Sequence, residues 1–63
     1  MLWAAVRRLP KRQAQSVALF YAADLPLTEI AEVLECSTGT VKSHLKRARS
    51  TLARKLAYQE ELA

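Results

Sequence analysis

The chain gathers small polar and long cationic side chains in the segment 37–47. Lys42, Lys46 and Arg47 are long hydrogen-bond donors, and an arginine fork matches the O6 and N7 atoms of guanine. Small residues in the same segment let a backbone approach phosphate groups: Ser37, Thr38, Gly39, Thr40 and Ser43. These residue types suit binding to phosphates and base edges of duplex DNA.

The charge pattern also favours a polyanionic partner. Ten Lys and Arg residues against six Asp and Glu residues give a formal net charge of +4 in 63 residues. All charges in residues 38–57 are positive, so this segment lacks the acidic i±4 partners that usually stabilise a solvated helix. An earlier basic cluster consists of Arg7, Arg8, Lys11 and Arg12. Its sequence is compatible with two roles, contact with a DNA backbone and simple solvation.

Several functional classes do not fit the residue types. One cysteine and one histidine cannot fill a tetrahedral zinc shell, and Cys36 alone cannot form an internal disulfide. We expect Cys36 to be a small buried hydrophobe. The sequence shows no paired carboxylates in an apolar setting, no nucleophile–base pair and no glycine-rich phosphate loop, so we expect no enzyme, cofactor or small-molecule substrate. No apolar run approaches the ~20 residues that span a bilayer, so we expect no membrane association.

The first half of the chain predicts two helices. Residues 2–8 form a short one, which Leu9-Pro10 ends because proline disfavours helical geometry in the preceding residue. Residues 11–23 form the second, and its apolar spacing predicts a buried stripe: Ala14, Val17, Ala18 and Tyr21. Trp3 and Phe20 are expected to pack in a core or interface rather than to stack on bases.

The second half predicts two further helices joined by a three-residue turn. Residues 27–34 form a two-turn helix, and Ser37 is a suitable N-cap for a fourth helix that runs to about residue 58. Its inward stripe recurs at helical spacing: Val41, Leu45, Ala48, Leu52 and Leu56. The stripe beyond Ala48 is expected to pack inside the domain or against a partner helix. We therefore predict one all-α domain over residues 1–63, with about four helices, a helix-turn-helix and no winged element.

Four segments together resemble region 4 of bacterial sigma factors, most closely the extracytoplasmic-function group. They are Leu9-Pro10-Lys11-Arg12-Gln13, residues 28–34 (TEIAEVL), residues 36–43 (CSTGTVKS) and Arg47-Ala48-Arg49. The resemblance covers about residues 2–56. It implies sequence-specific binding to the −35 promoter element, docking on the β flap of RNA polymerase, and masking by an anti-sigma factor. It also implies a cytoplasmic, nucleoid-associated location in a bacterium and a chain excised from a longer sigma factor.

Matching residue by residue, the resemblance assigns base reading to Lys42, Ser43, Lys46 and Arg47. It assigns groove insertion and phosphate contact to Ser37, Thr38, Gly39 and Thr40. Arg49 matches a further basic position for backbone contact or rim packing, and His44 stands on the same surface where the family often has arginine.

The sequence departs from the family at both turns and leaves other functions open. Glu35 and Asp24 stand where glycine is frequent, and we expect helix extension to accommodate Glu35. Pro26 replaces the usual capping Ser or Thr, so Glu29 cannot complete a capping box. The alternatives are a LuxR-type response-regulator output domain, which shares Thr-Val-Lys-Ser-His-Leu, and a protein-interaction module bound by an anti-sigma factor.

Overall fold

The computed structural model describes the backbone of residues 2–62 and the side chains of residues 3–55. Within these residues the chain forms only helices and turns. The elements are α1 (Leu2–Arg7), α2 (Lys11–Val17), the π-helical turn η1 (Ala18–Ala22), α3 (Leu27–Leu34) and α4 (Thr38–Leu62). The prediction of a small all-α domain with a helix-turn-helix is confirmed, α3 and α4 forming that motif.

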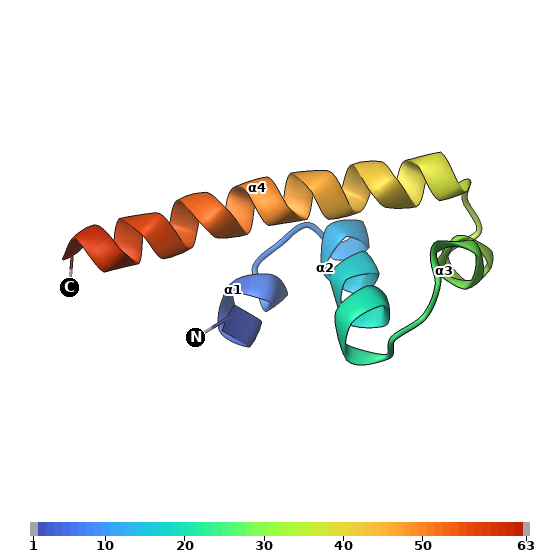
Figure 1. The fold of residues 1–63 in the computed structure, drawn as a ribbon, viewed down its shortest axis with the longest axis horizontal. Helices are drawn as coiled ribbons and strands as arrows, with labels where there is room; N and C mark the ends of the chain where they lie inside the picture. The colour runs from blue at the N-terminus through green and yellow to red at the C-terminus, as the bar shows by residue number, and fades with distance from the viewer. Residues whose placement is uncertain (1, 63) are drawn as a thin grey trace.

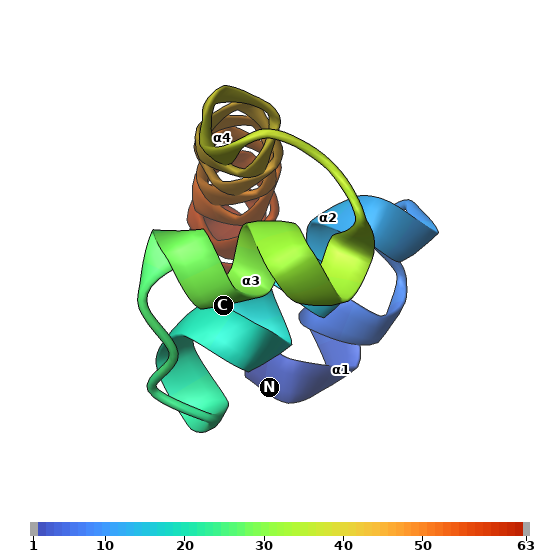
Figure 2. The same cartoon turned by 90° about the vertical axis from the view of Figure 1, so that its right-hand side faces the viewer.

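The three shorter helices all lie on one side of α4 (Figure 1). Since α4 has 25 residues, it sets the long dimension of a body that measures 40 × 19 × 16 Å. A view from the amino end of α4 shows α3 crossing beneath it, with α2 and α1 behind (Figure 2). The opposite side of α4 therefore carries no other part of the described chain.

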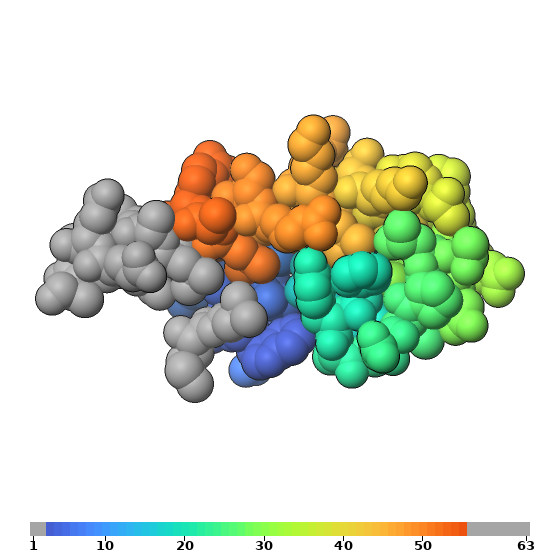
Figure 3. All heavy atoms as spheres, in the orientation of Figure 1, coloured from blue at the N-terminus to red at the C-terminus, as the bar shows by residue number. Residues whose placement is uncertain are grey.

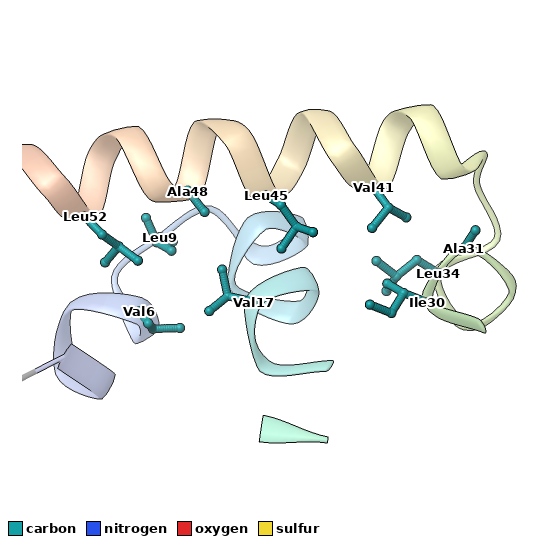
Figure 4. Packing of buried hydrophobic residues seen from close by; sticks show 10 residues of the cluster. All are labelled: Val6, Leu9, Val17, Ile30, Ala31, Leu34, Val41, Leu45, Ala48 and Leu52. Atoms are coloured by element: carbon teal, nitrogen blue, oxygen red, sulfur yellow. The ribbon is translucent and has the colours of Figure 1, made fainter. Parts of the chain in front are cut away.

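The hydrophobic core fills the space between α4 and the three shorter helices (Figure 4). Ile30 of α3 and Val41 of α4 are 0% exposed and hold the two helices of the motif together. Full burial of a side chain of this size contributes about 1.5–3 kcal/mol. The core consists of Val6, Leu9, Val17, Ile30, Ala31, Leu34, Val41, Leu45, Ala48 and Leu52. Leu52 packs inside the domain, whereas the side chain of Leu56 lies outside the described residues.

The predicted break between α1 and α2 is confirmed. The Leu9 amide donates to the Val6 carbonyl at 3.0 Å and ends α1, while Pro10 takes an extended conformation (φ −50°, ψ 146°) as the N-cap of α2. Proline has no amide hydrogen, so Pro10 itself adds no unpaired donor at this helix start. Leu9 itself is buried in the core, which anchors the turn.

The prediction for the second helix is wrong in its last turn. An α-helix was expected through residue 23, but residues 18–22 form a π-helical turn in which the Ala23 amide donates to the Ala18 carbonyl at 3.0 Å. The wider turn shifts the helical register, because each hydrogen bond encloses one more residue. Val17 is buried as predicted, but Tyr21 is 53% exposed, so its place in a buried stripe is wrong. Its ring meets Phe20 edge-to-face with centroids 4.9 Å apart.

The bounds of α3 match the prediction, and its two ends behave differently. Pro26 is the N-cap and makes no side-chain cap hydrogen bond, as expected from the missing Ser or Thr. At the other end, Glu35 adopts the left-handed conformation (φ 56°, ψ 50°). The Cys36 amide donates to the Ala31 carbonyl at 3.0 Å and the Glu35 amide to the Glu32 carbonyl at 3.3 Å, which is the Schellman pattern. The expected helix extension at Glu35 is therefore wrong. Cys36 is half-buried and packs against the core.

Candidate nucleic-acid interface

The Ser37 side chain fixes the start of α4. Its Oγ accepts a hydrogen bond from the Thr40 amide at 3.1 Å, and it lies 3.0 Å from the Thr40 hydroxyl oxygen. The predicted N-cap role of Ser37 is therefore confirmed, with the Thr40 amide as the donor. The Val41 amide donates to the Ser37 carbonyl at 3.1 Å and begins the regular helix. The cap therefore sets which side chains of α4 turn toward the core.

The bare side of α4 carries most of the residues predicted to bind DNA. Four core residues of α4 fall within a sector of about 60° around the helix axis, so the residues between them lie on the flanks or the opposite side. The exposed members of the predicted set are Ser37, Thr38, Gly39, Thr40, Lys42, Ser43, Lys46, Arg47 and Arg49. One short helical segment thus presents four long cationic side chains among small polar ones.

Gly39 occupies a position where the fold does not require glycine. A Cβ added there would meet only the Ser37 Oγ, at 3.8 Å, which is ordinary van der Waals contact. Its φ is not positive either. Because glycine in a helix is about 0.5–1 kcal/mol less stable than alanine, the domain gains nothing from it internally. The missing side chain leaves the backbone accessible at the exposed amino end of α4.

Among the residues whose side chains are described, none makes a hydrogen bond or an ion pair with Lys42, Lys46 or Arg47. The side-chain hydrogen bonds of the described residues include Arg49 but not Lys42, Lys46 or Arg47. Among residues 3–55, whose side chains are described, the acidic residues lie before α4, and all are exposed: Asp24, Glu29, Glu32 and Glu35. The surface thus keeps its positive charge at the end of α4 where the helix dipole is also positive.

His44 and Arg49 lie on the flanks of α4 rather than at the centre of its bare side. Their angular positions are about 70° either side of the core direction, and His44 is half-buried. Arg49 Nη1 donates to the Tyr21 hydroxyl at 3.2 Å, which draws the guanidinium toward η1. The structure therefore brings six of the predicted residues onto the bare side of α4, sets Ser37 and Thr38 at its exposed amino end, and places His44 and Arg49 on the flanks.

The first basic cluster belongs to another part of the molecule. Arg7 ends α1, Arg8 lies in the turn, and Lys11 and Arg12 begin α2. All four are exposed. They therefore belong to α1, the turn after it and α2 rather than to α4, and both roles considered for them remain predictions.

Sequence reasoning missed a pocket on the flank of α4. It has a volume of about 360 Å³ and is lined by Trp3, Val6, Val17, Tyr21, Arg49, Leu52 and Ala53. Four helical segments, α1, α2, η1 and α4, must come together to form it, so no single stretch of sequence signals it. One local feature of the sequence pointed to this region: Arg49 directly follows Ala48 of the buried stripe, which places a charged side chain at the edge of the core.

Comparison with known families decides between the sigma-factor and LuxR-type predictions. The family model described as "Sigma-70, region 4" matches residues 1–52. The chain belongs to the sigma-70 region 4 family. A comparison with curated proteins finds no match. The LuxR-type alternative is set aside, because the match covers the helix-turn-helix and both helices before it.

Membership of the region 4 family identifies the broad class of function. Region 4 is the part of sigma factors that binds −35 promoter DNA in transcription initiation, a DNA-binding and not an enzymatic role. Sigma factors work with RNA polymerase, so the family also implies that partner. Among the described residues, no helix combines the length and apolar character needed to cross a membrane.

Proposed function

We propose that this region 4 domain reads a −35 promoter element with the bare side of α4 placed in the major groove. The observation that carries the proposal is the one-sided packing of α4. Its core residues face the three shorter helices, and its opposite side is exposed, cationic and lined with small residues. The major groove is wide enough to admit one α-helix.

Within this proposal, the length and position of each side chain determine which part of the DNA it contacts. Lys42, Lys46 and Arg47 reach base edges, and Ser43 contacts the groove between them. The amino end of α4 binds phosphate, because its unpaired amides and helix dipole favour an anion. Ser37, Thr38, Gly39 and Thr40 provide that end. His44 and Arg49, on the flanks, are assigned to the DNA backbone beside the groove.

The finer biological role is also part of the proposal. The domain acts within an alternative sigma factor of the extracytoplasmic-function group, in the bacterial cytoplasm at the nucleoid. The β flap of RNA polymerase and an anti-sigma factor are its protein partners. Polymerase and the rest of the sigma factor supply further contacts, so the 63-residue chain alone is expected to bind DNA weakly.

The test compares two arginines of α4 that carry the same charge. The preferred duplex is first selected from random DNA, with and without RNA polymerase. Arg47→Ala is expected to reduce the preference for that duplex over a scrambled one by about tenfold, since a good base contact contributes ~1–3 kcal/mol. Arg54→Ala removes the same charge about 10 Å further along the helix and is expected to weaken both complexes equally.

Two results would contradict the proposal. The first is a wild-type chain that selects no sequence and binds all duplexes with equal affinity. The second is an Arg47→Ala variant that keeps its helical circular dichroism spectrum and its full preference. Salt titration adds an independent check, because binding through neutralised phosphates weakens steeply as salt rises.

A further inference from the structure

A polar contact joins η1 to one flank of α4. Arg49 Nη1 donates to the Tyr21 hydroxyl at 3.2 Å, across 28 residues of sequence. Among residues 3–55 it is the only hydrogen bond between side chains of different elements. In Figure 3 the teal side chains of η1 lie against the orange part of α4. Both partners are exposed, Tyr21 by 53%, so core packing does not account for the phenol.

The contact leaves hydrogen-bond donors unused on both partners. A tyrosine hydroxyl that accepts a hydrogen bond keeps its own hydrogen, and the guanidinium has further N–H donors beside the one used here. Among residues 3–55, no acidic side chain hydrogen-bonds to Arg49. The pair therefore presents donors and a positive charge to solvent, which suits an anion with several acceptor oxygens.

Arg49 occupies the outer edge of the proposed reading surface. Around the helix axis, Lys46, Lys42 and Arg49 lie about 130°, 90° and 70° from the core direction on the same flank. An α-helix with its side chains is about 10–12 Å across, and the major groove is about 12 Å wide. With the bare side of α4 in the groove, the two lysines therefore face the bases, and Arg49 faces the groove wall, where the phosphates lie.

We propose that Tyr21 and Arg49 together bind one phosphate of the groove wall, which adds η1 to the DNA interface. This inference rests on the proposed function, because it requires the bare side of α4 to lie in the major groove. The Tyr21 hydroxyl orients the guanidinium, and both groups donate to oxygens of the same phosphate. Edge-to-face packing against Phe20, with ring centroids 4.9 Å apart, holds the phenol in place. Such a contact fixes the register of the protein on the duplex without reading a base.

The test measures affinity for the selected −35 duplex and for a scrambled one by fluorescence anisotropy. Tyr21→Phe removes the hydroxyl and keeps the ring. It is expected to weaken both complexes by about threefold to tenfold, the usual range for one hydrogen bond, and to leave the preference between them unchanged. Arg49→Gln should weaken both complexes more. It should also lower the slope of log affinity against log salt by about 0.9, whereas the uncharged phenol should leave the slope unchanged.

Two further measurements show whether both side chains meet the same phosphate. In the Arg49→Gln background, Tyr21→Phe should have little additional effect, whereas in the matched Arg54→Gln background it should keep its full effect, since Arg49 is its hydrogen-bond partner. Phosphates of the selected duplex are then replaced one at a time by neutral methylphosphonate. At one position the wild type should lose affinity, and Tyr21→Phe and Arg49→Gln should lose much less.

The outcomes separate this inference from the proposed function. If the wild type selects a sequence and Tyr21→Phe, with its helical circular dichroism spectrum intact, binds both duplexes as tightly, the phosphate contact is refuted and the proposed function stands. Fully additive losses in the double variant would refute a shared phosphate. A changed preference in Tyr21→Phe would indicate a role in base reading and also overturn the inference. A wild type that selects no sequence overturns the proposed function, and the inference falls with it.

Discussion

The left-handed residue in the helix-turn-helix provides a sharp test of how the motif is held. Glu35 joins α3 to the turn with φ 56° and ψ 50°, a conformation that glycine adopts freely and other residues do not. The Schellman hydrogen bonds from Glu35 and Cys36 require that conformation. The Glu35 side chain is exposed. Glu35→Gly should therefore stabilise the domain by relieving the backbone alone.

The expected magnitude follows from two opposing effects on the backbone. A left-handed conformation costs a residue with a Cβ about 1–2 kcal/mol. Glycine loses more freedom on folding, which offsets about 0.5–1 kcal/mol of that gain. The net stabilisation is therefore about 0.5–1 kcal/mol. For a domain of this size it corresponds to a rise in Tm of about 2–8 °C.

The assay is thermal and urea unfolding followed by far-UV circular dichroism, with Glu35→Ala as the control. Alanine removes the same carboxylate but keeps a Cβ. The free energy of unfolding of Glu35→Ala should therefore not exceed that of the wild type. The urea m-value should stay the same in all three proteins, because the buried surface does not change. If Glu35→Gly proves no more stable than Glu35→Ala, the left-handed strain is not the cause and the reasoning fails.

Three further predictions concern the positioning of α4. Ser37→Ala should lower the free energy of unfolding by about 1 kcal/mol through loss of the N-cap, whereas Ser43→Ala, which caps nothing, should change it by less than about 0.5 kcal/mol; equal losses in urea unfolding would contradict the cap. Gly39→Ala should raise stability by up to about 0.5–1 kcal/mol and yet weaken DNA binding in fluorescence anisotropy, and unchanged binding would show that no phosphate approaches this backbone. Ile30→Ala should cost about 2–5 kcal/mol while Val33→Ala, at a side chain 58% exposed, should cost about 0.5 kcal/mol or less, and similar costs in urea unfolding would refute the core assignment.

The helix-turn-helix could be predicted from sequence because local signals define it. Pro26 marks the start of α3, Ser37 caps α4, and the apolar spacing between them belongs to one two-turn helix. Each signal acts through residues within one turn of it, so no knowledge of the tertiary structure is needed. The exposed surface of α4 follows directly, since fixing the buried stripe also fixes its opposite side.

The features that sequence did not predict depend on distant contacts or on unusual backbone geometry. The π-helical turn shifts the register of α2 by part of a turn, and nothing in the run Ala18–Ala22 announces it. It leaves Tyr21 exposed and within reach of Arg49, 28 residues later in the chain. Glu35 and Asp24 adopt positive φ angles that a glycine would have signalled. The pocket requires Tyr21 of η1 and Arg49 of α4 to lie next to α1.

The continuity of α4 has a mechanical consequence. A single unbroken helix of 25 residues, about 37 Å long, forms one wall of the pocket and also carries the proposed reading surface. No break in α4 separates the pocket wall from the reading surface, so the helix moves as one rigid body against the other helices. A tilt that lifts its amino end must press its second half toward α1 and narrow the pocket. Any molecule that occupies that space would therefore resist the tilt.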